Sequence, residues 1–315
     1  MKKIFITFIL YALIISDTYS QCCAAGNPLG GDGSQESLNK KELIVFTSFK
    51  HSLSQQYYHL DSEYNLSNIE KSYYNYQNLA ISYGLFSRLS VYGELGYFYD
   101  KTQLININNK ETIIQSSGLG DLNISLRYQV FKTVKPISQL VISGSLKLPL
   151  GAFHEEINGA TVPISLQPSS GAIKYNAGIF YSRKRADRNL GWNTFLLFET
   201  SNTIEQAYLI YKYGNLLQYS LAATYQINKK LNLIFNSKLE WRAHDKRENE
   251  IIIESTGSKV IYINPQLIYN FIPNWSLLLI SDLPIYKYVN GYQLTNCYSI
   301  QIGIRKNFKF CNSYK

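Results

Sequence analysis

Several features that define other classes of protein are scarce in this sequence. Only 17% of its 315 residues are charged, and it contains a single Met and four Cys. Hydrophobic residues make up 45% and aromatic residues 14%, which is too much for a solvated, disordered chain. Beyond the first 20 residues, no apolar run reaches the roughly 18 residues that a transmembrane helix needs. The composition therefore excludes both disorder and a helical membrane bundle.

The four cysteines do not form a disulfide scaffold. Cys22 and Cys23 are adjacent, and two adjacent thiols supply at most half of a tetrahedral metal site. Cys297 and Cys311 lie on what reads as one strand and would be ~46 Å apart at ~3.3 Å per residue, far beyond the Cα separation of about 7 Å that a disulfide tolerates. We expect no cofactor and no metal site. A lipid on Cys22 stays open as an alternative, and a metal role for the Cys22–Cys23 pair is a weaker one.

The first residues have the pattern of an export signal. Lys2 and Lys3 precede an apolar stretch from Ile4 to Ile15, and Thr18 and Ser20 are the small residues before an expected cleavage. About twelve apolar residues are too few to cross a hydrocarbon core of ~30 Å as a helix. We predict a signal peptide at 1–20, a flexible arm rich in Gly, Ser and Asn at 21–40, a barrel at 41–310 and a C-terminal tail at 311–315.

A period of two runs through the remaining chain. From Leu217 to Ile227 every odd position is apolar and most even positions are small or polar, which places the apolar residues on one face of a strand but all around a helix. Most of these segments have ten or more residues, as a tilted strand needs to cross a bilayer. Twelve strands are predicted: 41–51, 72–86, 89–99, 119–131, 138–149, 172–183, 191–200, 216–227, 231–243, 259–271, 275–287 and 295–308.

The connections between these strands alternate in length through most of the chain. Outer-membrane barrels have short periplasmic turns, longer external loops and an even number of antiparallel strands. Twelve strands put both ends of the barrel in the periplasm. The long connections are 52–71, 100–118, 150–171, 201–215 and 244–258. The short ones are 87–88, 132–137, 184–190, 228–230 and 272–274, with 288–294 intermediate.

The polar face of the strands distinguishes a barrel from a soluble sandwich. Lys238, Glu240 and Arg242 share the face opposite the apolar one, and a dry sandwich core would not accept them, whereas a hydrated lumen does. We therefore predict a transmembrane antiparallel β-barrel in the bacterial outer membrane, with Tyr and Trp girdles near the strand ends. The candidate lumen-lining residues are Glu94, Asp121, Arg127, Lys147, Lys174, Glu199, Lys238, Glu240, Arg242, Asp282 and Arg305.

These charges suggest how the interior is built. Six basic and five acidic candidates nearly balance, which favours a cross-linked interior over a pore that selects ions by one sign of charge. Twelve strands lie between the eight that side chains fill and the sixteen that leave a channel, so a narrow or plugged passage is expected. A selective path for a small solute is the other interpretation.

Short glycine-based motifs resemble a known family. Ser117-Gly118-Leu119-Gly120-Asp121-Leu122, Leu146-Lys147-Leu148-Pro149-Leu150-Gly151 and Leu283-Pro284-Ile285-Tyr286 are similar to the outer-membrane family named for the MetA pathway of phenol degradation, and the start of the chain resembles its Bacteroidetes members labelled transporter. The resemblance spans roughly residues 40–310. It implies an outer-membrane barrel that passes a small, apolar or aromatic compound, and it brings no catalytic residues.

The resulting hypothesis is a passive channel or transporter. A structural or surface-interaction barrel with a closed lumen is the alternative, and an outer-membrane lipid hydrolase is a more distant one. An enzyme is not expected, because His51, His59, His154 and His244 all lie in predicted loops or at strand ends and no catalytic motif is present. The net charge of +9 comes with no nucleic-acid motif, so outer-membrane lipid headgroups and a small-molecule solute are the expected partners.

Overall fold

The computed structural model describes residues 35–65, 69–107, 110–134, 137–153, 156–157, 160–185, 189–206 and 209–310. The predicted signal peptide, Cys22, Cys23, His154, Cys311 and the tail lie outside the described residues. Within these ranges, no helix is long and apolar enough to span a membrane.

Long strands make up most of the described chain. The strands of the main sheet are β1 (Glu42–Leu60), β2 (Ser62–Tyr64), β3 (Ile69–Gly84), β4 (Leu89–Ile107), β5 (Lys110–Leu119), β6 (Leu122–Val134), β7 (Ile137–Leu148), β10 (Lys174–Arg185), β11 (Leu190–Ser201), β14 (Leu216–Gln226), β15 (Leu231–Arg242), β17 (Ser258–Ile272) and β18 (Trp275–Lys309). The loops contain β8 (Glu156–Ile157), β9 (Ala160–Thr161), β12 (Ile204–Gln206), β13 (Leu209–Lys212), β16 (Lys246–Arg247) and the 3-10 turns η1 (Ile164–Leu166) and η3 (Glu248–Glu250).

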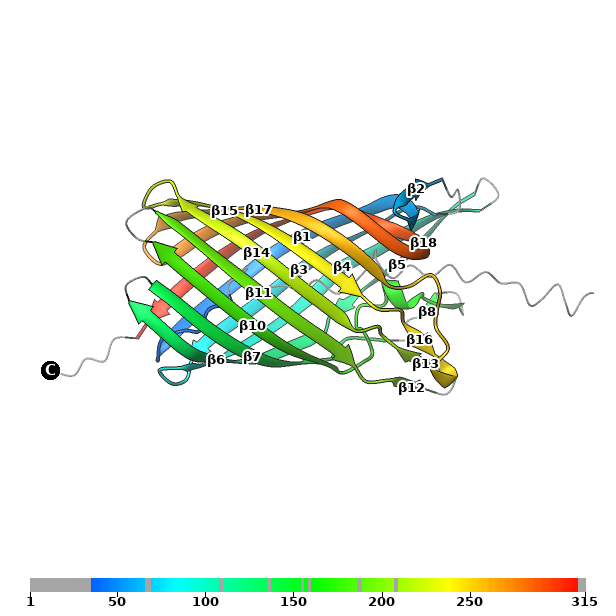
Figure 1. Cartoon of the computed structure of the whole chain (residues 1–315). Coiled ribbons are helices and arrows are strands. Elements are labelled where there is room, and N and C mark those ends of the chain that lie inside the picture. The colour runs from blue at the N-terminus through cyan, green and yellow to red at the C-terminus, as the bar shows by residue number, and fades with distance from the viewer. Residues whose placement is uncertain are drawn as a thin grey trace, which may run out of the picture.

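The main sheet closes on itself (Figure 1). Its neighbours follow the order β18-β17-β15-β14-β11-β10-β7-β6-β4-β3-β1, and β1 pairs with β18 to complete the ring. The pairings around the ring are antiparallel, and the closing one runs from Glu42 opposite Lys309 to Leu60 opposite Val289. A closed ring leaves no strand edge, which is the condition for a sheet to cross hydrocarbon.

The last element contains two passes of the chain. The first half of β18 pairs with β17 up to Val289, and the second half pairs with β1. The Asn307 N–H donates to the Asn274 carbonyl at 2.9 Å, so the two halves are also neighbours. The chain reverses at Asn290-Gly291, where Gly291 has a φ of +62° that favours glycine. Counting both halves, the described ring has twelve antiparallel passes, as the periodicity predicts.

The two faces of the wall have opposite chemistry. Along β14, Gln218 and Ser220 are buried inside, whereas Tyr219 and Leu221 are 45% and 48% exposed on the outside. This pattern is the reverse of a soluble protein and fits a wall between lipid and a polar lumen. Exposed aromatic residues also lie where girdles are predicted: Tyr97, Tyr99, Trp192, Tyr225, Trp241 and Trp275.

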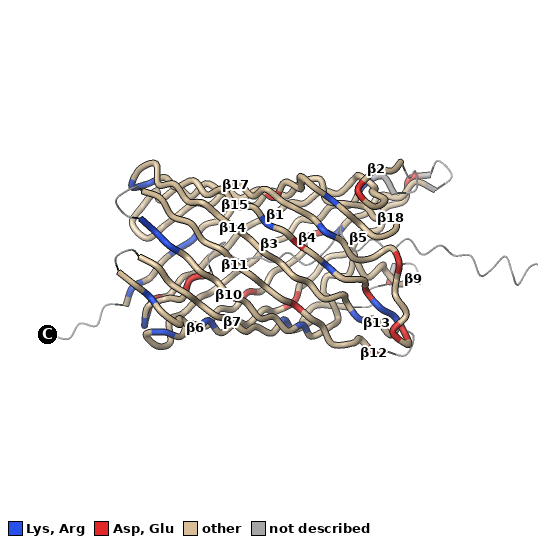
Figure 2. The backbone as a smooth tube through the Cα atoms, viewed as in Figure 1, with Lys and Arg blue, Asp and Glu red and all other residues tan. Residues whose placement is uncertain are grey.

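The two ends of the ring differ in the length of their connections (Figure 1). The turns β3–β4, β6–β7, β10–β11, β14–β15 and β17–β18 are short and lie at one end, here called the short-turn end. The opposite, long-loop end carries η1 and the small strands. Three predicted connections differ. Residues 52–71 are mostly strand, because β1 continues to Leu60 and β3 begins at Ile69; residues 100–118 mostly extend β4 and β5 as a paired hairpin; and 288–294 narrows to the turn at Asn290-Gly291. Basic residues gather at the short-turn end (Figure 2).

Candidate functional site

The interior of the barrel contains a cavity of about 790 Å³. Strands from all around the ring contribute to its lining, through hydroxyl and amide side chains such as Ser143, Asn176, Gln218 and Gln301. These residues occupy alternate positions because side chains of a strand point to opposite faces every second residue. The same alternation that buries apolar groups in lipid therefore supplies a hydrogen-bonding lumen.

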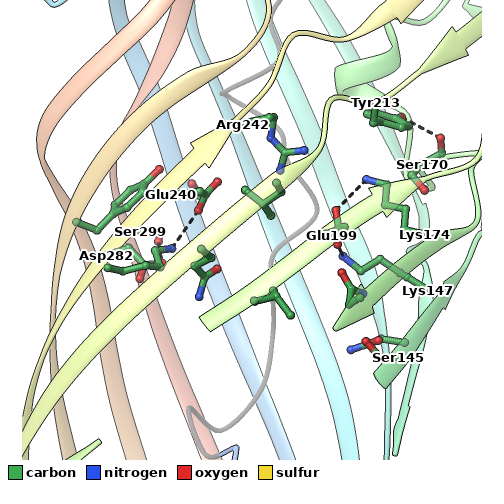
Figure 3. Close-up of a pocket in the computed structure, with 18 of the residues that line it drawn as sticks. Ser145, Lys147, Ser170, Lys174, Glu199, Tyr213, Glu240, Arg242, Asp282 and Ser299 are labelled. Atoms are coloured by element: carbon green, nitrogen blue, oxygen red, sulfur yellow. Dashed lines mark hydrogen bonds and ion pairs between the residues drawn. The ribbon is translucent and has the colours of Figure 1, made fainter. Parts of the chain in front are cut away.

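A carboxylate between two lysines forms the most concentrated charge group of this cavity. The Lys147 Nζ lies 3.1 Å from one Glu199 oxygen, and the Lys174 Nζ lies 3.7 Å from the other. Lys174 also lies over the Tyr213 ring, 4.1 Å from its centre. The register explains the cluster: β10 pairs Lys174 with Lys147 of β7 and with Ser201 of β11. Figure 3 shows the group facing the cavity together with Arg242 and Glu240.

A second charge group lies on the opposite part of the wall. The Lys50 Nζ lies 2.8 Å from an Asp282 oxygen, and the Ser299 hydroxyl donates to the same carboxylate at 2.7 Å. Lys238 lies 3.5 Å from Glu240 on one strand. Because these groups are only partly buried in a polar lumen, they avoid the full cost of placing a charge in a dry core, and the Lys50–Asp282 pair links β1 to the first half of β18.

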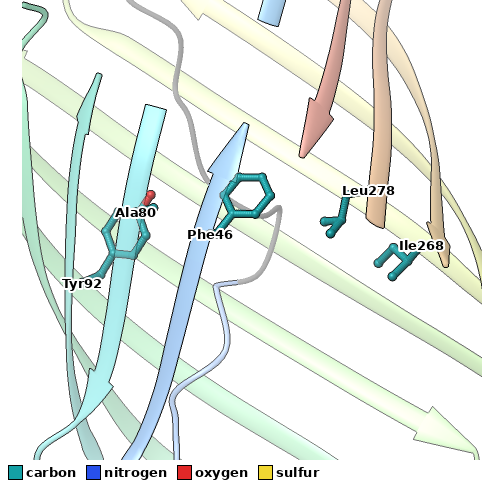
Figure 4. Close-up of a cluster of buried hydrophobic side chains, with 5 residues drawn as sticks. All are labelled: Phe46, Ala80, Tyr92, Ile268 and Leu278. Carbon is teal, nitrogen blue, oxygen red and sulfur yellow. The ribbon is translucent and has the colours of Figure 1, made fainter. Parts of the chain in front are cut away.

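An apolar cluster occupies the part of the lumen nearer the short-turn end. Phe46, Ala80, Tyr92, Ile268 and Leu278 are buried together (Figure 4). Phe46 points inward four residues before Lys50, and Leu278 four residues before Asp282. The lumen thus changes from charged to apolar over about 13 Å measured along the strands, the length of four residues.

A loop between β7 and β10 covers the cavity at the long-loop end. We call residues 160–173 the inward loop; Ile164, Ser165 and Gln167 of this loop line the cavity. The Lys101 Nζ donates to the Gln167 carbonyl at 2.7 Å. Ser116 donates to the carbonyl of Leu166, which is almost fully buried.

Asp121 holds the end of the inward loop. Its carboxylate accepts from the Ser169 hydroxyl at 2.7 Å and from the Ser170 N–H at 2.9 Å. The Tyr213 hydroxyl donates to the Ser170 carbonyl at 2.9 Å. These bonds tie the loop to both sides of the barrel mouth.

A small sheet adds to this cover. It has the order β12-β13-β16. Asp245, fully buried beside it, accepts from the Gly214 N–H at 2.7 Å and from the Tyr211 hydroxyl. Its own N–H donates to the Thr256 hydroxyl at 2.8 Å. The carboxylate thus holds the segment 211–214, and the Asp245 backbone holds Thr256, so this one residue fixes the loops relative to each other.

Residues before β1 lie across the short-turn end. Gln35 lines the cavity, and the Ser37 side chain is buried with its hydroxyl 3.3 Å from that of Ser90. Glu36 forms an ion pair of 3.1 Å with Lys184. These contacts connect the segment to β4 and β10, so chain lies across both mouths of the described lumen.

The structure places most of the predicted lumen residues at the cavity. Those that line it are Arg127, Lys147, Lys174, Glu199, Lys238, Glu240, Arg242 and Asp282. The other three lie outside its lining. Glu94 is buried behind it and accepts from the amide of Asn78, Asp121 lies under the inward loop, and Arg305 lies in β18 near the short-turn end.

Sequence reasoning missed four charged residues of the lining: Lys50, Lys101, Asp245 and Arg247. With them, the lining has eight basic and four acidic residues, so the near balance of six to five does not describe the cavity. The inward position of Lys50 could have been predicted, because it lies an even number of residues from the inward-pointing Phe46 on the same strand. Lys101 was not, since a bulge between Phe98 and Lys101 breaks the register.

The fold and wall chemistry define the class: a closed antiparallel ring, apolar outside and polar inside, is an outer-membrane β-barrel. The chain belongs to the family described as "Putative MetA-pathway of phenol degradation", whose model matches residues 54–287. This confirms the family resemblance. No curated protein matches the sequence.

Among the solved structures that match, one with a TM-score above 0.5 supports the fold. An outer membrane channel from Pseudomonas putida F1 is 13% identical, with a TM-score of 0.71 over 89% of this chain and 100% of that chain. The NanC porin is 12% identical over 84% and 98%, with a TM-score of 0.45. The translocator domain of the autotransporter NalP from Neisseria meningitidis is 10% identical over 86% and 90%, with a TM-score of 0.46. At these identities the similarity concerns the fold.

Proposed function

We propose that this protein is a passive outer-membrane channel for a small solute. The observation that carries the proposal is the cavity of about 790 Å³ inside the closed ring. Its size falls within the roughly 300–1,000 Å³ of sites that hold one small molecule. It is far narrower than the lumen of barrels with sixteen or more strands. The similarity in fold to the Pseudomonas putida F1 channel supports the same function.

The long-loop end is the external end in this proposal, because outer-membrane barrels place their long loops outside. A solute would enter past the inward loop, cross the charged zone and leave past the apolar cluster. The inward loop, the charged zone and the apolar cluster narrow this route, so only a small solute would pass.

A passive role also agrees with the described histidines. None of His51, His59 and His244 lines the cavity. His51 is bonded through Nδ1 to the Asn75 side chain at 2.9 Å, and His59 stacks on Tyr292 with ring centres 4.5 Å apart. General-base catalysis needs a base at the substrate, so we propose that the protein is not an enzyme.

Liposome swelling tests the proposal. Vesicles containing the folded barrel should swell faster in arabinose than in sucrose, and faster in sucrose than in raffinose. The closed-lumen alternative is favoured by the chain segments that cross both mouths, and it predicts swelling no faster than in protein-free vesicles for any of the three sugars. That result, from a barrel shown to be folded by its heat-modifiable migration in gels, would reject the channel.

A further inference from the structure

The cavity lining carries an excess of four positive charges. Its basic residues are Lys50, Lys101, Arg127, Lys147, Lys174, Lys238, Arg242 and Arg247, and its acidic residues are Glu199, Glu240, Asp245 and Asp282. A pore lined by an excess of one sign favours ions of the other sign. Asp245 accepts hydrogen bonds from two neutral donors, which do not offset its negative charge, so it is included in this excess of four.

The excess is concentrated around Glu199. Lys147 and Lys174 flank its two oxygens, and both ammonium groups have side chains only 7% exposed. Arg242 adds to the positive field at the same carboxylate, and Figure 3 shows it on the same part of the cavity wall. Three cations therefore surround one anion, which leaves a local surplus even with both lysine contacts in place.

An apolar surface begins directly beside this group. Leu197 and Phe195 precede Glu199 by two and four residues on the same face of β11, so they lie about 7 and 13 Å away along the strand. Both line the cavity, as does Phe180, and the three are buried with Val141 in one cluster. A cationic zone and an aromatic wall are thus within the length of one small molecule.

We propose that the channel selects small organic anions, with a carboxylate near Lys147, Lys174 and Arg242 and an apolar body on Leu197 and Phe195. The ammonium and guanidinium groups would form charge-assisted hydrogen bonds to the carboxylate. The aryl or alkyl body would replace water on the apolar wall. This inference rests on the proposed channel function and adds the substrate class.

Ion selectivity is the first test. Planar bilayers holding the protein, with a tenfold KCl gradient, should show a reversal potential of the sign that reports chloride over potassium. Glu199→Gln removes the one carboxylate of the group and should strengthen this preference. Lys147→Gln combined with Lys174→Gln lowers the excess from four charges to two and should shift the reversal potential toward zero, and an unchanged reversal potential would contradict the role of these lysines. Lys229→Gln removes the same kind of charge from an exposed turn and should leave the reversal potential unchanged.

Block of the KCl current tests the apolar part of the site. Sodium phenylacetate should block at concentrations about tenfold lower than sodium acetate, since the ring adds apolar burial, and phenethylammonium chloride should not block at the same concentration. Leu197→Asn should remove the difference between phenylacetate and acetate while keeping anion selectivity. This variant retains all charges of the group, so it tests the site even where the double lysine variant does not fold.

The outcomes separate the two proposals. A folded barrel with neither conductance nor solute flux overturns the channel and this inference together. A conducting barrel that prefers potassium, or that phenethylammonium blocks as well as phenylacetate, overturns the substrate class and leaves the channel in place.

Discussion

Asp121 offers a direct test of how the mouth at the long-loop end is held. Its carboxylate accepts from Ser169 at 2.7 Å and from the Ser170 N–H at 2.9 Å, and it lies immediately before β6, outside the barrel ladder. Asp121→Ala therefore removes the anchor of the inward loop without removing a backbone hydrogen bond of the ring. We predict that the variant folds and that its loop leaves the mouth more often.

The magnitude follows from the two bonds. A hydrogen bond to a charged group contributes about 1.5–3 kcal/mol, so removing both weakens the attachment of the loop by about 3 kcal/mol at the lower bound. Since 1.4 kcal/mol is a factor of ten, the population with a displaced loop should rise by roughly two orders of magnitude. The bonds from Lys101 and Ser116 to the loop remain, and they limit the displacement to its Ser169–Ser170 end.

Single-channel recording measures this effect. The Asp121→Ala variant should show larger mean conductance, or more frequent transitions to a larger conductance, than the unmodified protein. Asp100→Ala is the matched control, because Asp100 is also a hydrogen-bonded carboxylate but bonds to Asn75 in the wall. If Asp121→Ala and Asp100→Ala both conduct as the unmodified protein does, the inward loop does not restrict the mouth.

Three further outcomes are expected. Lys50→Met leaves the Asp282 carboxylate in the lumen without its ammonium partner. The barrel should lose about 1–3 kcal/mol of stability, between the values for an exposed and a buried ion pair, seen as a lower midpoint of heat-induced unfolding; an unchanged midpoint would show that the pair does not stabilise the wall. Gly96→Ala should lower the free energy of unfolding, measured in urea, by about 1–3 kcal/mol, because a Cβ there would lie 2.1 Å from the Tyr76 ring. Gly93→Ala on the same strand is the control, since its Cβ would meet nothing within 4 Å. Equal effects of the two changes would contradict this packing. Brominated lipids should quench the tryptophan fluorescence strongly and aqueous iodide weakly, and the reverse would refute the outward placement of Trp192, Trp241 and Trp275.

The membrane-spanning part of the fold was predictable because lipid imposes a rule on every residue. Within the wall, each side chain faces either hydrocarbon or the lumen, so β14 and its neighbours alternate strictly. Beyond the membrane-spanning part of the wall, side chains on both faces of a strand can meet water, so the rule no longer applies. Residues Asp100–Gln103 are polar on both faces, yet the ladder between β4 and β5 continues, and the sequence pattern alone reads this hairpin as a loop.

The candidate site was predictable wherever side chains alternate regularly between the lumen and the outside of the barrel. Glu199 and Arg242 follow from alternation along uninterrupted strands. Lys101 depends on a bulge, and Asp245 and Arg247 reach the cavity from loops, for which no period exists. The charge balance of the lumen therefore could not be derived from the strands alone, since part of its lining is contributed by segments outside them.

The pairing of β1 with β18 has a consequence for biogenesis. The contact between Lys50 and Asp282 joins residues 232 positions apart, and the seam itself pairs Glu42 with Lys309 at one end and Leu60 with Val289 at the other, which are similarly distant in the chain. Neither partner strand can find the other until the polypeptide is nearly finished, so the ring has two open edges throughout synthesis and export. Exposed edges invite aggregation, and long-range pairing is slow. Delivery of this chain to the membrane therefore depends on keeping those edges apart from other chains until the seam closes.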